Sequence, residues 1–494
     1  MTAAETFYWH DYETFGLSRD ERRPAQFAGR RTDLDLNPVG GADVLYCRPS
    51  PDFLPSPESC LLTRILPQYC EEHGLPEVRF AHEVLDRLSA RGTIGIGYNT
   101  MSFDDEVTRF LFWRNFIPPY AREYENGCGR WDLYPLVLAV WALRGKGIVW
   151  PLRRDWIPRL EEKRLFRSAA ADEPLQGVTF KLECLTAANG LVHEKAHDAM
   201  SDVDGTIALA RLIRDKVPRL WRWAFDHRTK QKVRDELSSR QASVWVDPHL
   251  GQQTGYLRCV VEIGAKPGNP NEVLLWDLMQ DPEELFGFSE EELRSRLTAK
   301  ERKGAPVYSL RANKAPFVCA DLRVLPDARA EEFGVDKALV ERNLGKFTPQ
   351  MIERVAALVS SAFAKEAEEE KTAEDADDAL YSAGFPSWRD KDTVKEVSLL
   401  GGEKLAERIG EGKIFFENPV YEELLLRYRA RNFPWTLSPE EERLWRKEAA
   451  ERLGAKVPGY EARLAELGAA VPEEGKRILS ALLDWEGRAK KAFL

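Results

Sequence analysis

Hydrophobic and polar positions divide the 494-residue chain into a first part in which strands and helices alternate and a last part with helices alone. Before residue 212, aromatic and β-branched runs predict strands, and apolar positions spaced by three and four residues predict helices. The predicted strands are 7–12, 25–33, 44–48 and 93–97, and the predicted helices are 77–90, 104–115, 132–143 and 199–217. The first three strands fit an antiparallel meander, and the whole order indicates an α/β fold. Residues 148–177 contain three prolines and five arginines without a clear period, which predicts a loop region.

The pattern changes near residue 218. Short apolar runs at 256–263, 273–278, 306–310 and 317–319, with a turn at 265–271, predict a small barrel with intervening helices. Residues 366–378 are almost all acidic, alanine or lysine, which indicates either an exposed helix or a linker. The rest is predicted to be helical, at 392–410, 420–432, 439–453, 460–467 and 473–493.

Two carboxylates stand out on the first predicted strand. Side chains alternate between the faces of a strand, so Asp11 and Glu13 share one face and lie close together. Like charges in an apolar setting need compensation, and a divalent cation supplies it. The alternative is an exposed edge strand with acidic side chains.

Further acidic groups begin two later helices. Asp104 follows the strand 93–97 and starts a helix, where it could also be a simple N-cap. His197 and Asp202 are about 140° apart on one helix, so they converge only if His197 lies in the preceding loop, with Asp198 as N-cap. Acidic groups at a strand and at two helix starts are typical of a two-metal phosphodiesterase. The alternative for His197 is a helix-start residue with one hydrogen bond.

Together these motifs resemble the DEDDh 3′→5′ exonucleases, and in particular the bacterial exonuclease I family. The resemblance covers nearly the whole chain. It rests on the motifs His10-Asp11-Tyr12-Glu13-Thr14-Phe15-Gly16, Arg23-Pro24-Ala25-Gln26-Phe27, Gly97-Tyr98-Asn99, Phe103-Asp104-Asp105-Glu106-Val107-Thr108-Arg109, Ala196-His197-Asp198-Ala199-Met200 and Tyr428-Arg429-Ala430-Arg431-Asn432-Phe433-Pro434. It implies an RNase H-like exonuclease domain at 1–212, a Src-homology-3-like β-barrel domain with helices at 213–365, and an α-helical C-terminal domain at 366–494.

The resemblance also implies a mechanism. Asp11, Glu13 and Asp202 would hold one Mg²⁺, Asp11 would bridge to a second, and Asp104 would bind directly or through water. Mn²⁺ is an expected substitute. His197 would be the general base, because an imidazole with a pKa of about 6.5 is neutral at pH 7 and can accept a proton. The expected reaction is processive 3′→5′ degradation of single-stranded DNA to 5′-mononucleotides, in DNA repair and recombination.

Several residues are expected to contact the DNA, with Glu13 among them. Lys181 stands where relatives have an arginine that touches the phosphate, and a solvated lysine is the alternative. Arg109, Tyr120 and Tyr124 follow Asp104 and are candidates for phosphate and base contacts, although the tyrosines fit a core role equally well. The bases Arg427, Arg429 and Arg431 are expected to contact the DNA backbone. On this view the nuclease domain alone, ending near residues 211–218, would still cleave but would lose processivity.

Composition sets the remaining expectations. A net charge of −10 argues against indiscriminate nucleic-acid binding. Seven scattered cysteines without a Cys-x2-Cys pair, and the absence of a signal or membrane segment, indicate a cytoplasmic protein, expected to be a monomer. Residues 210–240 carry ten basic and four acidic side chains. Relatives bind the acidic C-terminal tail of single-stranded-DNA-binding protein (SSB), and Arg144, Arg219–Arg228 and Trp223 are its expected surface here.

Two other functions fit parts of the sequence. An RNA-trimming exonuclease would use the same catalytic residues, and only the length of the resemblance argues against it. A DNA-binding scaffold with an inactive nuclease fold is the second alternative. The presence of all five motif residues argues against that function, because a decayed site typically loses a carboxylate.

Overall fold

The fold was obtained as a computed structural model, which describes residues 5–18, 21–168, 174–191, 198–287, 289, 291–292, 306–364 and 375–494. Its contacts divide the chain into two compact units. Unit 1 comprises residues 1–129, 151–207 and 371–494, and unit 2 comprises residues 130–150 and 208–370. The helical C-terminal part therefore belongs to the same unit as the first sheet. No helix in the described part of the chain is long and apolar enough to cross a membrane.

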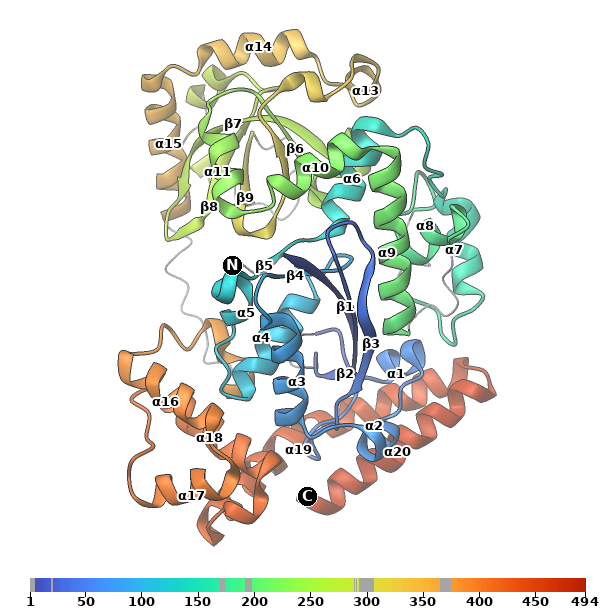
Figure 1. The fold of residues 1–494 in the computed structure, drawn as a ribbon, viewed down its shortest axis with the longest axis vertical. Coiled ribbons are helices and arrows are strands. Elements are labelled where there is room, and N and C mark those ends of the chain that lie inside the picture. Colours follow the sequence, from blue (N-terminus) through green and yellow to red (C-terminus); the bar gives the residue numbers. More distant parts are fainter. Residues whose placement is uncertain are drawn as a thin grey trace. The chain divides into compact units, whose positions relative to one another are not determined.

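The first sheet has the strand order β3-β2-β1-β4-β5 (Figure 1). Its strands are β1 (Thr6–Thr14), β2 (Pro24–Thr32), β3 (Pro38–Tyr46), β4 (Thr93–Ile96) and β5 (Gly129–Arg130). β1, β2 and β3 form the predicted antiparallel meander, and β4 runs parallel to β1. The predicted RNase H-like α/β fold is thus confirmed, with β1 at the centre of the sheet.

The nuclease fold contains the predicted helices near 77–90, 104–115 and 199–217, together with five that were not predicted. They are α1 (Pro57–Thr63), α2 (Pro67–His73), α3 (Glu77–Ser89), α4 (Asp104–Arg114), α5 (Ala121–Tyr124), α7 (Arg153–Glu161), α8 (Leu182–Ala188) and α9 (Ala199–Lys216). The prediction of a loop over 148–177 is wrong where α7 forms. Only Ile157 of this helix is buried and Pro158 lies inside it, so no apolar period marks it.

Unit 2 contains the second sheet, of order β10-β6-β7-β8-β9. Its strands are β6 (Ser243–Val246), β7 (Leu257–Lys266), β8 (Asn269–Asp277), β9 (Val307–Arg311) and β10 (Phe317–Cys319). β6 was not predicted, and the expected turn at 265–271 is much shorter, because β7 and β8 continue to a tight turn at Pro267 and Gly268. Gly268 has a φ of +76°, which glycine adopts without strain.

Helices surround this second sheet in the same unit. They are α6 (Leu133–Arg144), α10 (Pro218–Asp226), α11 (Lys230–Ser238), α13 (Asp327–Glu332), α14 (Lys337–Lys346) and α15 (Pro349–Ala364). The small barrel with helices is confirmed.

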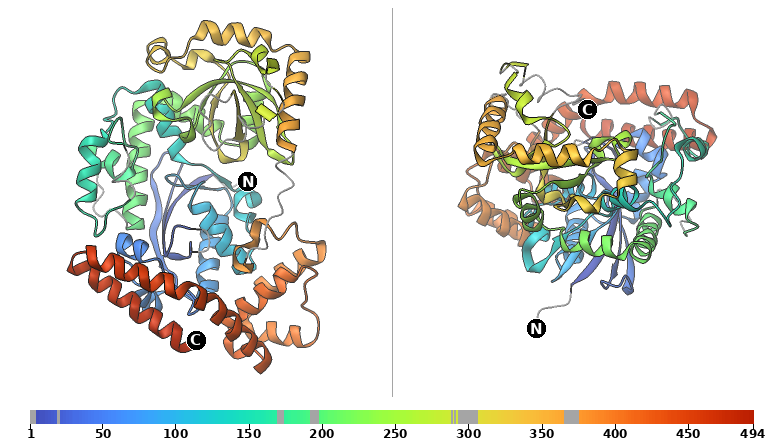
Figure 2. Two further views of the ribbon diagram at one scale, coloured as in Figure 1. Left: turned by 180° about the vertical axis from the view of Figure 1, so that it is seen from behind. Right: turned by 90° about the horizontal axis from the view of Figure 1, so that it is seen from above.

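The C-terminal helices are α16 (Trp388–Leu399), α17 (Gly402–Gly410), α18 (Pro419–Asn432), α19 (Pro439–Ala470) and α20 (Glu473–Phe493). The predicted helix 392–410 is in fact α16 and α17, separated at Leu400 and Gly401. The predicted helices 439–453 and 460–467 are the single helix α19, which continues through Pro458. α19 lies along α20 (Figure 2), where Leu464, Leu467, Leu479 and Leu482 share one apolar cluster.

These helices complete the core of the nuclease fold. Phe15, Phe53 and Cys60 pack in one cluster with Leu464 and Leu482. Phe110 and Trp113 of α4 pack in a second cluster with Val397, Leu424 and Tyr428. A chain that ends near residues 211–218 would expose these apolar side chains to water, so the expectation of an autonomous nuclease domain does not suit this fold.

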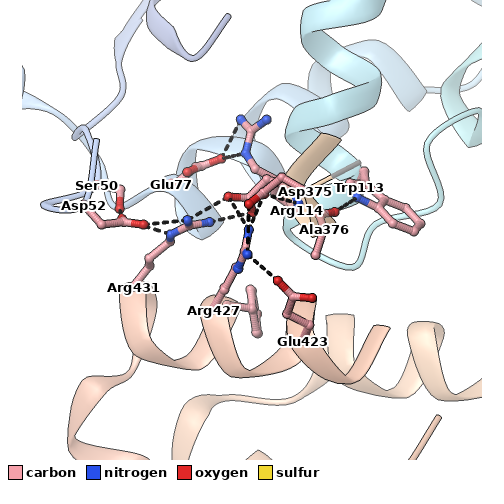
Figure 3. A network of polar contacts seen from close by, with 12 residues as sticks. Ser50, Asp52, Glu77, Trp113, Arg114, Asp375, Ala376, Glu423, Arg427 and Arg431 are labelled. Carbon is pink, nitrogen blue, oxygen red and sulfur yellow. Dashed lines mark hydrogen bonds and ion pairs between the residues drawn. The ribbon is translucent and has the colours of Figure 1, made fainter. Parts of the chain in front are cut away.

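A buried network of arginines and carboxylates also joins the C-terminal helices to the nuclease fold within unit 1 (Figure 3). Arg431 on α18 pairs with Asp52 and with Asp377, each at 2.7 Å. Asp377 lies in the short helix η9 (Ala376–Tyr381), accepts a hydrogen bond from Arg23 at 2.9 Å and is 3% exposed. Arg427 pairs with Asp375 in the same network.

This network overturns two expectations. Residues 376–378 are buried or partly buried in η9 rather than part of an exposed tether, and 366–374 lie outside the described residues. Arg427, Arg429 and Arg431 do not face DNA, because all three side chains are at most 7% exposed and are paired with carboxylates. The many arginines of α18 suggest a DNA-binding surface in the sequence, but their carboxylate partners include Asp52 and Asp377, which lie far from them in the chain.

Candidate active site

The central strand β1 positions the first two acidic residues of the site. Asp11 and Glu13 are two residues apart, so both side chains leave the same face of the sheet. Glu13 is 8% exposed, and β1 is covered on both edges by β2 and β4. The alternative of an exposed acidic edge strand is therefore wrong.

Helix α9 brings the third carboxylate to this face. Asp202 lies in the first turn of the helix. One carboxylate oxygen each from Asp11, Glu13 and Asp202 lies within 4.8 Å of the other two. Among the residues that the structure describes, no other group of three or more histidines, cysteines and acids meets this condition. Residues from two distant parts of the sequence thus converge as predicted.

Asp104 contacts the backbone of β1 beside these carboxylates. It is the first residue of α4, with Phe103 at the N-cap, so the alternative that Asp104 caps its own helix is wrong. Its Oδ1 accepts a hydrogen bond at 3.0 Å from the backbone N–H of Tyr12, the residue between Asp11 and Glu13. Asp104 is 2% exposed, and its charge adds to that of the three converging carboxylates.

The electrostatics of this cluster favour a cation. Burial raises the pKa of Asp11 well above its usual range, and repulsion by Asp104, Asp202 and Glu13 raises it further. Burial and the nearby carboxylates raise the pKa of Glu13 in the same way. Such a cluster is stabilised either by protons or by a bound cation. Carboxylate oxygens are the ligands that Mg²⁺ and Mn²⁺ prefer, so the donor set fits a divalent metal ion.

Helix α9 begins shortly after His197, the predicted base. His197 lies outside the described residues. Asp198 directly precedes α9, and its backbone carbonyl accepts a hydrogen bond at 3.1 Å from the N–H of Asp202, as expected for an N-cap residue. The side chain of Gln26 contacts both Asp198 and Ala199. A lone amide in the apolar strand Pro24-Ala25-Gln26-Phe27 is the signal in the sequence that marks Gln26, for which no role was predicted.

Lys181 lies at the start of α8 and is partly exposed. Its N–H donates to Thr179 Oγ1 at 3.3 Å. The hydroxyl of Tyr98 donates to the carbonyl of Phe180 at 2.5 Å, which ties the residue before Lys181 to the segment after β4.

The other predicted DNA-contact residues differ in exposure. Arg109 is buried between Glu106 and Glu123, at 2.6 and 2.8 Å, so the structure gives it a role in joining α4 to α5. Its guanidinium also lies over the ring of Tyr120, 5.1 Å from the ring centre. Tyr120 is 37% exposed and Tyr124 is 68% exposed, so Tyr124 is not part of the core.

A central strand with two carboxylates and a helix that returns a third define the exonuclease class of RNase H-like proteins. The family model described as "Exonuclease" matches residues 8–210. Two further models, "Exonuclease I SH3-like domain" and "Exonuclease I C-terminal domain", match residues 228–365 and 374–489. The chain belongs to the exodeoxyribonuclease I family, and it is an exonuclease.

Relatives and solved structures agree with this assignment. The chain is 36% identical to exodeoxyribonuclease I of Haemophilus influenzae over 473 residues, which are 94% of this chain and 93% of that protein. It is 37% identical to exodeoxyribonuclease I of Escherichia coli, over 89% of this chain and 88% of that protein. The zinc-bound form of an Escherichia coli exonuclease I–single-stranded DNA complex aligns with a TM-score of 0.85 and 34% identity, over 99% and 100% of the chains. A structure of SSB and exonuclease I with an inhibitor aligns with a TM-score of 0.85 and 32% identity, over 98% and 100%.

Proposed function

We propose that this protein is a Mg²⁺-dependent 3′→5′ exonuclease that degrades single-stranded DNA processively to 5′-mononucleotides, in DNA repair and recombination. The convergence of Asp11, Glu13 and Asp202 within 4.8 Å is the observation that carries the proposal. The single-stranded DNA and the bound metal of the Escherichia coli relative support the choice of substrate and of a divalent ion.

Each residue of the site has a distinct task in this proposal. Asp11, Glu13 and Asp202 would hold the divalent metal ions. When bound, such ions would supply Lewis-acid polarisation of the phosphate and of the attacking water. His197 accepts the proton of that water. Asp104 keeps β1 in place through the N–H of Tyr12 and adds negative charge to the site.

The remaining contacts concern the substrate. Lys181 is proposed to bind the phosphate that is cleaved, as a single positive charge rather than the two-pronged donor of an arginine. Tyr120 and Tyr124 are exposed enough for stacking against bases.

A digest tests this function directly. With Mg²⁺, 5′-labelled single-stranded DNA should shorten from the 3′ end with release of 5′-mononucleotides, whereas duplex DNA and RNA should persist. Chelation of the metal should abolish cleavage, because the carboxylates alone only repel the phosphate. An excess of unlabelled DNA added at the start tests processivity. Cleavage that is insensitive to chelator would contradict the metal-dependent mechanism, and faster loss of RNA would favour the RNA-trimming alternative.

We also propose that the acidic tail of SSB binds unit 2, where a pocket lies between α6, α10 and β10. It is lined by Trp131, Asp132, Pro135, Leu136, Trp223, Ala224, His227, Ala315, Pro316, Phe317 and Val318. Trp223 stacks on His227 with ring centres 3.7 Å apart, which leaves an aromatic wall for an apolar side chain. Arg144 and Arg222, on α6 and α10 of the same unit, are exposed and can attract the acids of the tail.

Reversing charge at Arg144 and Arg222 together tests this surface. The affinity for an SSB tail peptide should fall at least about tenfold, because two attractive charges become repulsive. Fluorescence anisotropy of a labelled peptide measures the change. Arg443→Glu, an exposed reversal on α19, serves as the matched control and should bind like the parent. Unchanged binding by the double variant would exclude this surface.

A further inference from the structure

Gln26 is a buried amide on β2 that faces the metal-binding strand. It is 1% exposed, and it pairs directly with Glu13 in the antiparallel register of β1 and β2. Its neighbours Ala25 and Phe27 are fully buried apolar residues. A polar side chain in such a strand is costly to bury unless both its donor and its acceptor find partners.

All of its hydrogen-bonding groups have such partners. The amide nitrogen donates to Tyr46 Oη at 3.0 Å and to Asp198 Oδ1 at 3.3 Å. The amide oxygen accepts a hydrogen bond at 3.2 Å from the backbone N–H of Ala199, the first residue of α9. One side chain therefore joins the strand beside Glu13 to the start of the helix that carries Asp202.

This contact lies beside the metal-binding carboxylates. Asp202 lies one helical turn after Asp198, and its N–H bonds to the carbonyl of that residue. Any shift of the helix start against β2 would therefore change the separation of Asp202 from Glu13. The carboxylate of Asp198 also lies near enough to Glu13 to repel it, and the amide of Gln26 gives that carboxylate a neutral donor.

We propose that Gln26 is a positioning residue of the nuclease: its carboxamide fixes the start of α9 against β2 and so sets the spacing of the three metal-binding carboxylates. The proposal rests on the metal-dependent function above. The chemistry requires glutamine, since methionine fills the same space without hydrogen bonds. Glutamate would replace the donor by a charge that repels Asp198.

Gln26→Met tests the proposal in the full-length protein. We expect kcat on single-stranded DNA to fall about 10- to 100-fold, the usual effect of removing a residue that orients metal ligands. KM for DNA should change less than about threefold, because Gln26 does not reach the surface. Isothermal titration of Mg²⁺ into the DNA-free protein should show a dissociation constant raised roughly three- to tenfold.

Gln68→Met is the matched control for a purely structural effect. Gln68 is a partly buried amide of the same unit that donates to the carbonyl of Ala481 at 2.6 Å, on α20. It should lose thermal stability to a similar extent but keep the parent kcat and Mg²⁺ affinity. Asp198→Ala removes one of the two hydrogen bonds between Gln26 and the start of α9, so it should lower kcat by a smaller factor than Gln26→Met, and it reports on the contact if Gln26→Met does not fold.

The outcomes separate this proposal from the proposed function. If Gln26→Met or the folded Asp198→Ala variant keeps the parent kcat and Mg²⁺ affinity, the positioning role is overturned, while Mg²⁺-dependent cleavage by the parent still supports the function. If the parent shows no metal-dependent cleavage, the function itself fails. Loss of kcat together with weaker Mg²⁺ binding in both variants, but not in Gln68→Met, supports the positioning role.

Discussion

Replacing Asp202 with alanine is expected to reduce cleavage of single-stranded DNA by at least about a thousandfold. Loss of a metal ligand removes several kcal/mol of transition-state stabilisation, and about 4 kcal/mol corresponds to three powers of ten in rate. Binding of single-stranded DNA should change little. Single-turnover cleavage at saturating enzyme measures the rate of the chemical step.

The same variant should be slightly more resistant to heat than the parent when a chelator is present. Asp202 repels Asp11 and Glu13 and helps to raise their pKa values, so its removal relieves that repulsion in the metal-free protein. Asp204→Ala is the matched control, because Asp204 lies on the same helix, is half exposed and pairs with Arg30. Asp204→Ala should cleave like the parent. Residual activity above about a tenth of the parent in Asp202→Ala would show that Asp202 is not a ligand.

Replacing Arg431 with leucine is expected to be the most destabilising single change in the C-terminal helices. The substitution leaves Asp52 and Asp377 as buried carboxylates with fewer partners, which costs about 3–5 kcal/mol. The midpoint temperature of the first unfolding transition, measured by scanning calorimetry, should fall by roughly 10 °C. Arg443→Leu breaks an exposed pair with Glu440 and should change stability by less than about 1 kcal/mol. Equal losses in the two variants would contradict a stabilising role of the network.

The loss of stability in Arg431→Leu should depend on pH, because Asp52 and Asp377 titrate. Burial opposes their charge, but the arginines outweigh it and lower the pKa of Asp52 and of Asp377 below the ordinary value. An aspartate with a depressed pKa stabilises the folded protein at pH values above its ordinary pKa of about 4. This stabilisation is lost progressively as the pH falls below about 4 toward the depressed pKa. The gap in stability between the parent and Arg431→Leu should therefore be widest near neutral pH and should narrow in acid.

The sequence predicted well what is set by neighbouring residues. The alternation in β1 placed Asp11 and Glu13 on one face, and the helix start at Asp198 placed Asp202 in the first turn of α9. The sequence predicts two helices where the structure has the single helix α19, because Pro458 interrupts the local helical pattern. Packing against α20 keeps the helix continuous.

Contacts between distant segments could not be predicted in this way. An apolar stripe on α20 shows that the helix buries one face, but it does not show that α1 and α2 are the partners. Arg431 is an ordinary basic residue of an Arg-rich helix until Asp52, 379 residues earlier, is placed beside it. Gln26 is informative only once its register with Glu13 and its contact with Ala199 are known.

The union of the first and last parts of the chain in one core has a consequence for biosynthesis. Arg431 leaves the ribosome 379 residues after Asp52, and Trp485, which donates to the carbonyl of Phe53, emerges later still. At about 5–20 residues per second the nascent nuclease sheet waits roughly 20–80 s for the helices that close its core. During that time its apolar face and unpaired acids are open to chaperones and proteases. Translation that stops early thus yields an unfinished fold, and the enzyme matures only when its whole chain has been made.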